Sequence, residues 1–180
     1  MFRLPFNSAL LLAPLVYAIH HAEEHLVFSF RDWRLRYFPD NNALTTEAVL
    51  VVLMAISMTY ILLHSTLRTK VSAWIVLVFL MATQVHNALF HLGGTLIFSD
   101  FSPGLITGLL LYIPVNCLIM HLALQEGYIN KRAAISIFVA GGFLFWGFEY
   151  LGPIVLLVTT ILTWAWALVD ARIEFLRKEG

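Results

Sequence analysis

His20, His21, Glu23, Glu24 and His25 put five titratable side chains into six consecutive positions. They lie in a long apolar run, where an ionisable side chain at the centre of a membrane helix costs about 2.5–3.5 kcal/mol. Imidazole nitrogens and carboxylate oxygens are ligands that iron, manganese and zinc share in proteins. The pattern therefore predicts a metal site, with Glu24 and Glu23 as its catalytic carboxylates.

Two overlapping patterns share Glu24. The first, H-x-x-E-E, combines His20 with Glu23 and Glu24, and its spacings of three and four put the groups on adjoining parts of one helix face. The second, H-x-x-E-H, combines His21 and His25 with Glu24 and formally matches an inverted zinc-protease motif. Neither string is specific by itself.

Polar residues of two later apolar runs complete the predicted site. At a rise of about 1.5 Å per residue, His91 and Glu149 fall at the depth of the first group, roughly 5–12 Å from the midplane. We expect both as further metal ligands, and the alternative for Glu149 is that it reaches the water of the lipid head groups. Asn87 shares a helix face with His91, and Tyr17 shares one with His20. These two side chains are predicted to donate hydrogen bonds to the ligands without binding the metal themselves.

The other polar side chains of the apolar runs have a simpler interpretation. His64 and His121 fall in a different layer of the bilayer, and His86 points away from His91. Transmembrane His and Asn side chains often hydrogen-bond a neighbouring helix at about 0.6 kcal/mol. We expect this structural role for His64, His86, Asn116 and His121.

The composition requires a membrane. The chain has 180 residues, of which 60% are hydrophobic and 12% charged, whereas soluble domains are about 45–50% apolar and about 25% charged. The excess apolar surface must face lipid. The net charge of zero gives no sign of a nucleic-acid partner. The predicted partners are the bilayer and a lipid-soluble small molecule.

The apolar runs predict an all-α, polytopic transmembrane bundle that forms one domain over residues 1–180. Six runs approach the roughly 20 residues that a spanning helix needs, at 7–28, 46–64, 72–97, 104–125, 133–151 and 154–171. The first is interpreted as a retained anchor and not as a cleaved signal peptide. The alternative is four spans and a re-entrant hairpin at Gly152–Pro153.

The basic residues predict the orientation. With six spans, eight Lys and Arg fall on one side and three, Arg31, Arg34 and Arg36, on the other. Because cytoplasmic loops carry the excess of Lys and Arg, both termini are predicted to be cytoplasmic. The His/Glu site then lies in the outer half of the bilayer.

The HxxEE string at the end of the first span, the later Asn87 and His91, and the SPG sequence at 102–104 resemble the HXXEE family of small membrane proteins. The resemblance covers roughly residues 15–120. The family is largely uncharacterised, so the resemblance implies functional roles for His20, Glu23, Glu24 and His91 without naming a reaction. It favours the first pattern over the second, and His21 and His25 are not part of the signature.

The leading functional hypothesis is a membrane-embedded, metal-dependent oxidoreductase of the di-iron or di-metal type, acting on a lipid or other apolar substrate. Mixed nitrogen and oxygen ligands favour iron or manganese, and zinc stays open. The alternatives are a zinc-dependent membrane hydrolase, a proton- or cation-coupled transporter that uses the same cluster, bis-histidine haem ligation and an accessory subunit.

Overall fold

The computed structural model describes residues 4–40 and 44–179, and these ranges are organised as helices and short connections. Arg3, which the charge count included, lies outside these ranges. The helices are α1 (Phe6–Ala9), α2 (Leu12–Ala22), η1 (Glu23–Val27), α3 (Phe30–Tyr37), α4 (Thr46–Leu67), α5 (Lys70–Leu80), η2 (Met81–His86), α6 (Asn87–Phe98), α7 (Leu105–Thr107), η3 (Gly108–Tyr112), α8 (Ile113–Gln125), α9 (Lys131–Leu151) and α10 (Ile154–Glu179). The η elements are π-helical turns within longer helical segments.

Five helical segments of the described chain are long and apolar enough to cross a membrane. They reproduce the predicted runs closely, and they are Thr46–Leu67, Lys70–Phe98, Leu105–Gln125, Lys131–Leu151 and Ile154–Arg177. The chain is thus an all-α, multi-pass membrane protein. The break at Gly152 and Pro153 separates two helices, α9 and α10, each of spanning length.

The first predicted span is present as an interrupted N-terminal helical segment and is not one of these five. A turn at Leu10 and Leu11 separates α1 from α2, and η1 follows α2 directly. Pro14 lies in the first turn of α2, where a residue without an N–H is tolerated. An unbroken helix would need that N–H to bond the carbonyl of Leu10, so the chain starts a new helix there.

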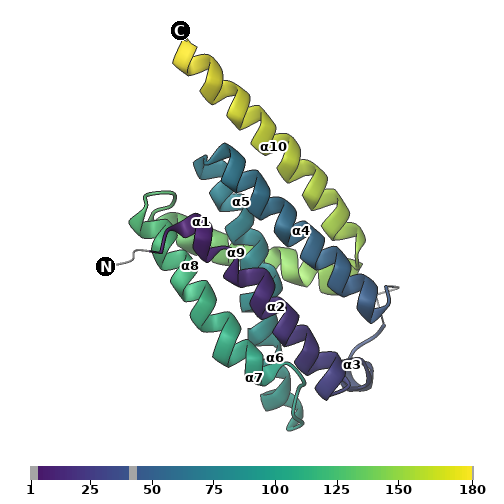
Figure 1. The fold of residues 1–180 in the computed structure, drawn as a ribbon. Coiled ribbons are helices and arrows are strands. Elements are labelled where there is room, and N and C mark those ends of the chain that lie inside the picture. The colour runs from purple at the N-terminus through teal and green to yellow at the C-terminus, as the bar shows by residue number, and fades with distance from the viewer. Residues whose placement is uncertain (1–3, 41–43, 180) are drawn as a thin grey trace.

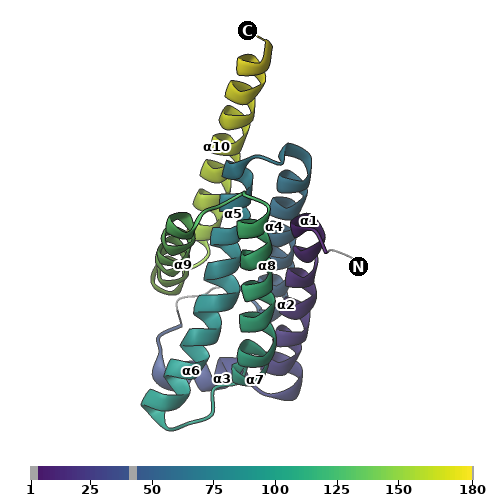
Figure 2. The ribbon, with the colours of Figure 1, turned by 90° about the vertical axis from the view of Figure 1, so that its left-hand side faces the viewer.

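The segment formed by α5, η2 and α6 is the centre of the bundle. Of the residues in its most apolar 18-residue stretch, 61% are buried, compared with 11% in the corresponding stretch of α10. Figures 1 and 2 show α2, α4, α5 and α8 running alongside one another, while α9 crosses them. A Cβ on Gly141 of α9 would lie 2.5 Å from Met81 Cβ, so the glycine permits this close crossing.

The outer faces of the helices are apolar. Large side chains of α9 and α10, such as Phe143, Leu157 and Ile161, are more than half exposed. The C-terminal half of α10 extends beyond the rest of the bundle (Figure 2). Apolar exposure of this kind is expected of a surface whose solvent is lipid.

Candidate metal centre

The helix type changes where the carboxylates of HHAEEH begin. His20 and His21 lie in the last turn of α2, whereas both glutamates and His25 lie in π-helical η1. The N–H of Phe28 donates to the carbonyl of Glu23 at 3.1 Å, across five residues. Such turns occur frequently at functional sites. The wider turn shifts the glutamate side chains out of the register of α2.

Glu24 lies between two buried histidines from different helices. Its Oε1 is 3.4 Å from Nε2 of His20 and 3.1 Å from Nε2 of His91 on α6. His20 and His91 are 1% and 0% exposed, and Glu24 is 7% exposed. Within the described ranges, this is one of two groups whose ligand atoms could hold a metal ion. We call it the first triad.

Hydroxyl groups hold the far side of both imidazole rings. Nδ1 of His20 is 2.8 Å from Thr107 Oγ1, and Nδ1 of His91 is 2.9 Å from Ser102 Oγ. Each ring therefore turns its Nε2 toward Glu24. In the part of the chain that the structure describes, both Nε2 atoms and Glu24 Oε1 are buried without a hydrogen-bond partner. Metal-binding histidines are commonly held in this way through the second nitrogen.

The spacing of the first triad fits a metal ion. Metal–nitrogen and metal–oxygen bonds of about 2.0 Å place neighbouring ligand atoms of a tetrahedron roughly 3.3 Å apart. The observed separations from Glu24 Oε1 are 3.1 and 3.4 Å. Both separations lie within ion-pair distance, and neither contact meets the geometric criteria of a hydrogen bond.

The other carboxylate oxygen of Glu24 faces the second group. Glu24 Oε2 is 3.6 Å from His25 Nε2, and the rings of His21 and His25 are 4.4 Å apart. His21, Glu24 and His25 form the second triad, which could also hold a metal ion. A single carboxylate is thus shared by two clusters of imidazoles.

Glu23 belongs to neither triad, although it was expected to be a ligand. Its Oε1 accepts hydrogen bonds from the N–H groups of Gly104 and Ile106 at 3.1 and 3.2 Å. Its Oε2 accepts from the N–H of Thr107 at 2.7 Å. A carboxylate at free N–H groups of a helix start is a stabilising cap. Glu23 therefore fixes the loop that carries Thr107 against η1.

The SPG turn at 102–104 packs directly on the first triad. Gly104 has a φ of +98°, a backbone conformation that favours glycine. A Cβ there would lie 2.8 Å from the ring of His91 and 2.9 Å from the ring of His20. Ser102 supplies the hydroxyl for His91, and its N–H donates to Thr95 Oγ1 at 2.9 Å. The turn thus covers and orients both imidazoles.

Residues 11–119, more than half of the chain, match a family described as "Protein of unknown function with HXXEE motif". The chain belongs to this HXXEE family. The signature reads His20-x-x-Glu23-Glu24 here, and the matched region contains both triads and the SPG turn. The two signature glutamates have different surroundings: Glu24 faces imidazoles, and Glu23 caps a helix start.

A curated relative of this HXXEE protein is similar over part of its length. It is the "Uncharacterized protein YrkK" of Bacillus subtilis (strain 168), 40% identical over 76 residues. The match covers 41% of this chain and 48% of the relative, so the chain spans about half the length of that protein. No solved structure matches the chain.

A cavity of about 140 Å³ opens onto the two triads. Tyr17, Glu24, Asn87 and Tyr112 are among its lining residues. The Tyr112 ring lies 4.3 Å from the ring of His20, and its buried hydroxyl has no hydrogen-bond partner among the described residues. The sequence interpretation missed Tyr112, because one tyrosine in an apolar run carries no spacing signal.

Glu149 lines the same cavity and forms an ion pair with Arg34. Its Oε2 accepts a 2.9 Å hydrogen bond from Arg34 of α3. Both side chains are mostly buried, at 17% and 15% exposed. The structure brings Glu149 to the edge of the cavity and into neither triad. The ion pair joins α3 to α9 beside the site.

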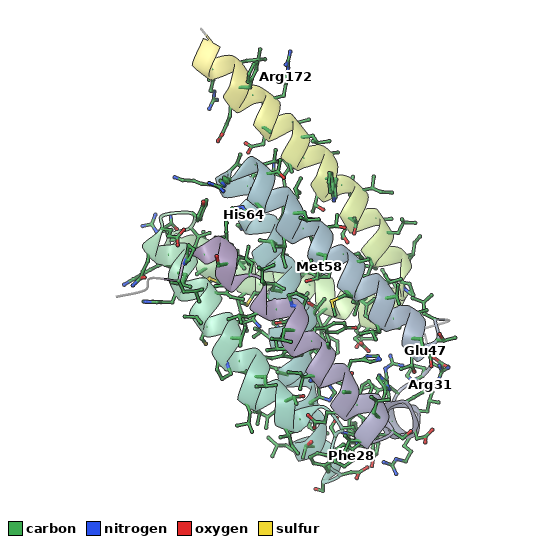
Figure 3. The ribbon with its side chains drawn as sticks, in the orientation of Figure 1. Phe28, Arg31, Glu47, Met58, His64 and Arg172 are labelled. Carbon is green, nitrogen blue, oxygen red and sulfur yellow. The ribbon has the colours of Figure 1, made fainter. Side chains whose placement is uncertain are left out.

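The other histidines lie away from the triads. His86 Nε2 contacts the carbonyl of Phe138 at 2.8 Å, and His64 Nδ1 contacts Ser72 Oγ at 2.9 Å. His64 lies toward the opposite end of α4 from Glu47 (Figure 3). His121 is exposed on the outside of α8. Asn116 donates to Gln84 Oε1 at 2.7 Å, an interhelical bond of the expected structural kind.

Proposed function

We propose that this HXXEE protein is a membrane-embedded metalloenzyme in which the two triads, which share Glu24, would hold a pair of transition-metal ions. The observation that carries the proposal is the convergence of His20 Nε2, His91 Nε2 and Glu24 Oε1, three buried atoms without hydrogen bonds in the described ranges. Buried polar atoms are almost always hydrogen-bonded, so three that are not, at ligand spacing from one another, would suit a cation.

The metal proposed is iron or manganese, although two imidazoles and one carboxylate also suit zinc. The ligand set consists of imidazoles and a carboxylate, and the described residues place no cysteine near it, since Cys117 is exposed elsewhere. Carboxylate-bridged metal pairs in helix bundles use such mixed sets. When bound, two redox-active ions would supply oxidation chemistry. The proposed reaction class is therefore an oxidoreduction, with Glu24 and the nearby tyrosines as the proton-transferring groups.

The surroundings of the triads favour an apolar substrate. Val49, Leu53 and Phe148 line the cavity beside the polar groups. A second, smaller cavity shares Leu53 and Phe148 and continues toward Leu144 and Leu156. Apolar walls exclude water and accept an acyl chain. We place the site in the outer half of the bilayer, with both termini cytoplasmic, from the distribution of Lys and Arg.

The reaction is tested in proteoliposomes of dimyristoyl phosphatidylglycerol, whose saturated chains resist peroxidation by free iron, with iron(II)-loaded protein, dioxygen and ascorbate as reductant. Dioxygen uptake and oxidised acyl chains are measured, the latter by mass spectrometry. Wild type and the control His86→Ala should oxidise lipid, and His91→Ala should not. Fatty-acid release by zinc-loaded protein without dioxygen uptake would contradict oxidoreduction and identify the hydrolase, whose motif the second triad matches.

A further inference from the structure

A separate pocket, which shares no residue with these two cavities, lies at the other end of the bundle from the triads. Its volume is about 330 Å³, and its walls come from the start of α5, the connection between α8 and α9, and α10. The residues that line it include Lys70, Trp74, Tyr128, Asn130, Ala133 and Trp166. The α4–α5 turn and the α8–α9 loop lie toward the same end of the bundle (Figures 1 and 2).

Two tryptophans from different helices line this pocket. The rings of Trp74 and Trp166 are 5.6 Å apart and edge-to-face, one from α5 and one from α10. Trp166 is 45% exposed. Tryptophan and tyrosine are enriched at the level of lipid head groups. Lys70 and Asn130, at the starts of α5 and α9, provide the polar rim above these rings.

The cations at the two ends of the bundle differ in their partners. At the end of the triads, Arg31, Arg34 and Arg36 each pair with a carboxylate at 2.9 Å. At the pocket end, Lys70 and Lys131 are exposed, and neither forms an ion pair with a described residue. The starts of α5 and α9 add the positive ends of two helix dipoles. Lys70 and Lys131 therefore offer two positive charges at this end that no described carboxylate pairs.

We propose that this pocket binds the head group of an anionic phospholipid from the surrounding leaflet. The phosphodiester would lie between Lys70 and the start of α9, and the acyl chains would follow Trp74 and Trp166 into the bilayer. Basic pockets between helices on the cytoplasmic side, where we place this end, are suited to anionic lipids. The pocket is remote from the triads, so its occupancy does not depend on metal binding.

The test is native mass spectrometry of delipidated protein in non-ionic detergent, titrated with dioleoyl phosphatidylglycerol or dioleoyl phosphatidylcholine. We expect one phosphatidylglycerol to bind preferentially. Lys70→Gln should weaken it about fivefold, the attraction of one basic side chain for an anionic lipid. Arg177→Gln, a charge control on the exposed end of α10, should leave it unchanged.

A space-filling variant separates a pocket from diffuse surface charge. Ala133→Phe fills the cavity without changing charge and should abolish the preference, whereas Ala165→Phe on the exposed face of α10 should not. Equal binding of the two lipids, or full phosphatidylglycerol binding by Ala133→Phe, would overturn the proposal. Competition by soluble glycerol 3-phosphate at equal concentration would also overturn it, since the ligand would then be a free phosphate ester.

Discussion

The amide N–H of Gly104 donates a 3.1 Å hydrogen bond to Oε1 of Glu23, and the same glycine packs on the rings of His20 and His91. One residue thus connects the capping glutamate of the signature to the imidazoles of the first triad. The cap and the triad are held by a single turn, so changes in the turn should alter both stability and metal binding.

Gly104→Ala should destabilise the protein and weaken metal binding. The added Cβ meets two imidazoles within 2.9 Å, and an alanine at this φ is strained. The strain alone is worth about 1–3 kcal/mol. Gly93→Ala is the matched control, since nothing lies within 4 Å of its Cβ, and it should be neutral or stabilising by about 0.5–1 kcal/mol. Thermal unfolding in detergent measures both, and equal melting temperatures for the two variants would disprove the packing role.

Glu23→Gln should lower stability and spare the metal ions. The carboxylate accepts three N–H bonds, and an amide replaces it with one oxygen and no charge. Loss of charge-assisted hydrogen bonds is worth about 1.5–3 kcal/mol. Metal content and melting temperature are measured on the same sample. If the variant lost its metal without losing stability, Glu23 would be a ligand and not a cap.

Ser102→Ala and Thr107→Val should weaken metal binding without removing a ligand. Each change deletes the hydroxyl that holds Nδ1 of one imidazole. Loss of such outer partners typically lowers metal affinity about 10–100-fold. Competition with a chelator gives the affinity, and Thr66→Val, which alters a hydroxyl bonded within α4, is the control. Unchanged affinity in both variants would show that the hydroxyls do not orient the rings.

Glu149→Gln should leave the metal content unchanged and loosen α3. The carboxylate pairs with Arg34 at 2.9 Å and lies outside both triads. The effects of mutating two residues in direct contact typically differ from additivity by about 0.5–3 kcal/mol. In a double-mutant cycle of melting temperatures, the combined variant should therefore lose less stability than Glu149→Gln and Arg34→Gln lose in sum. A loss of metal in Glu149→Gln alone would instead assign this residue as a ligand.

The apolar runs predicted the bundle well, because the bilayer fixes the length of a spanning helix. The five long segments begin and end near their expected positions. The first span differs: Pro14 and the turn before it interrupt the helix, and no single helix there has spanning length. Hydropathy alone does not register such an interruption, since the turn residues Leu10 and Leu11 are themselves apolar.

The part of the candidate site that depends on the depth of a residue along its helix was predictable from the sequence. Depth alone placed His91 at the level of His20 and Glu24, and the structure brings the three together. Rotation was harder to predict, because a constant turn of about 100° per residue does not hold through a π-helical turn such as η1. Nothing in the sequence indicated that the adjacent Glu23 and Glu24 have different surroundings. The surroundings of Glu23 are formed by a loop far along the chain, since Gly104 lies 81 residues away.

The central claim is tested most directly by elemental analysis of protein purified without chelators, for wild type beside Glu24→Gln. The account predicts about two equivalents of iron or manganese in wild type, one for each triad, as a shared carboxylate allows. Glu24→Gln should lose both, and Glu174→Gln, a control on α10, should lose neither. Wild-type protein that is folded but contains less than about a tenth of an equivalent of any transition metal would contradict the account.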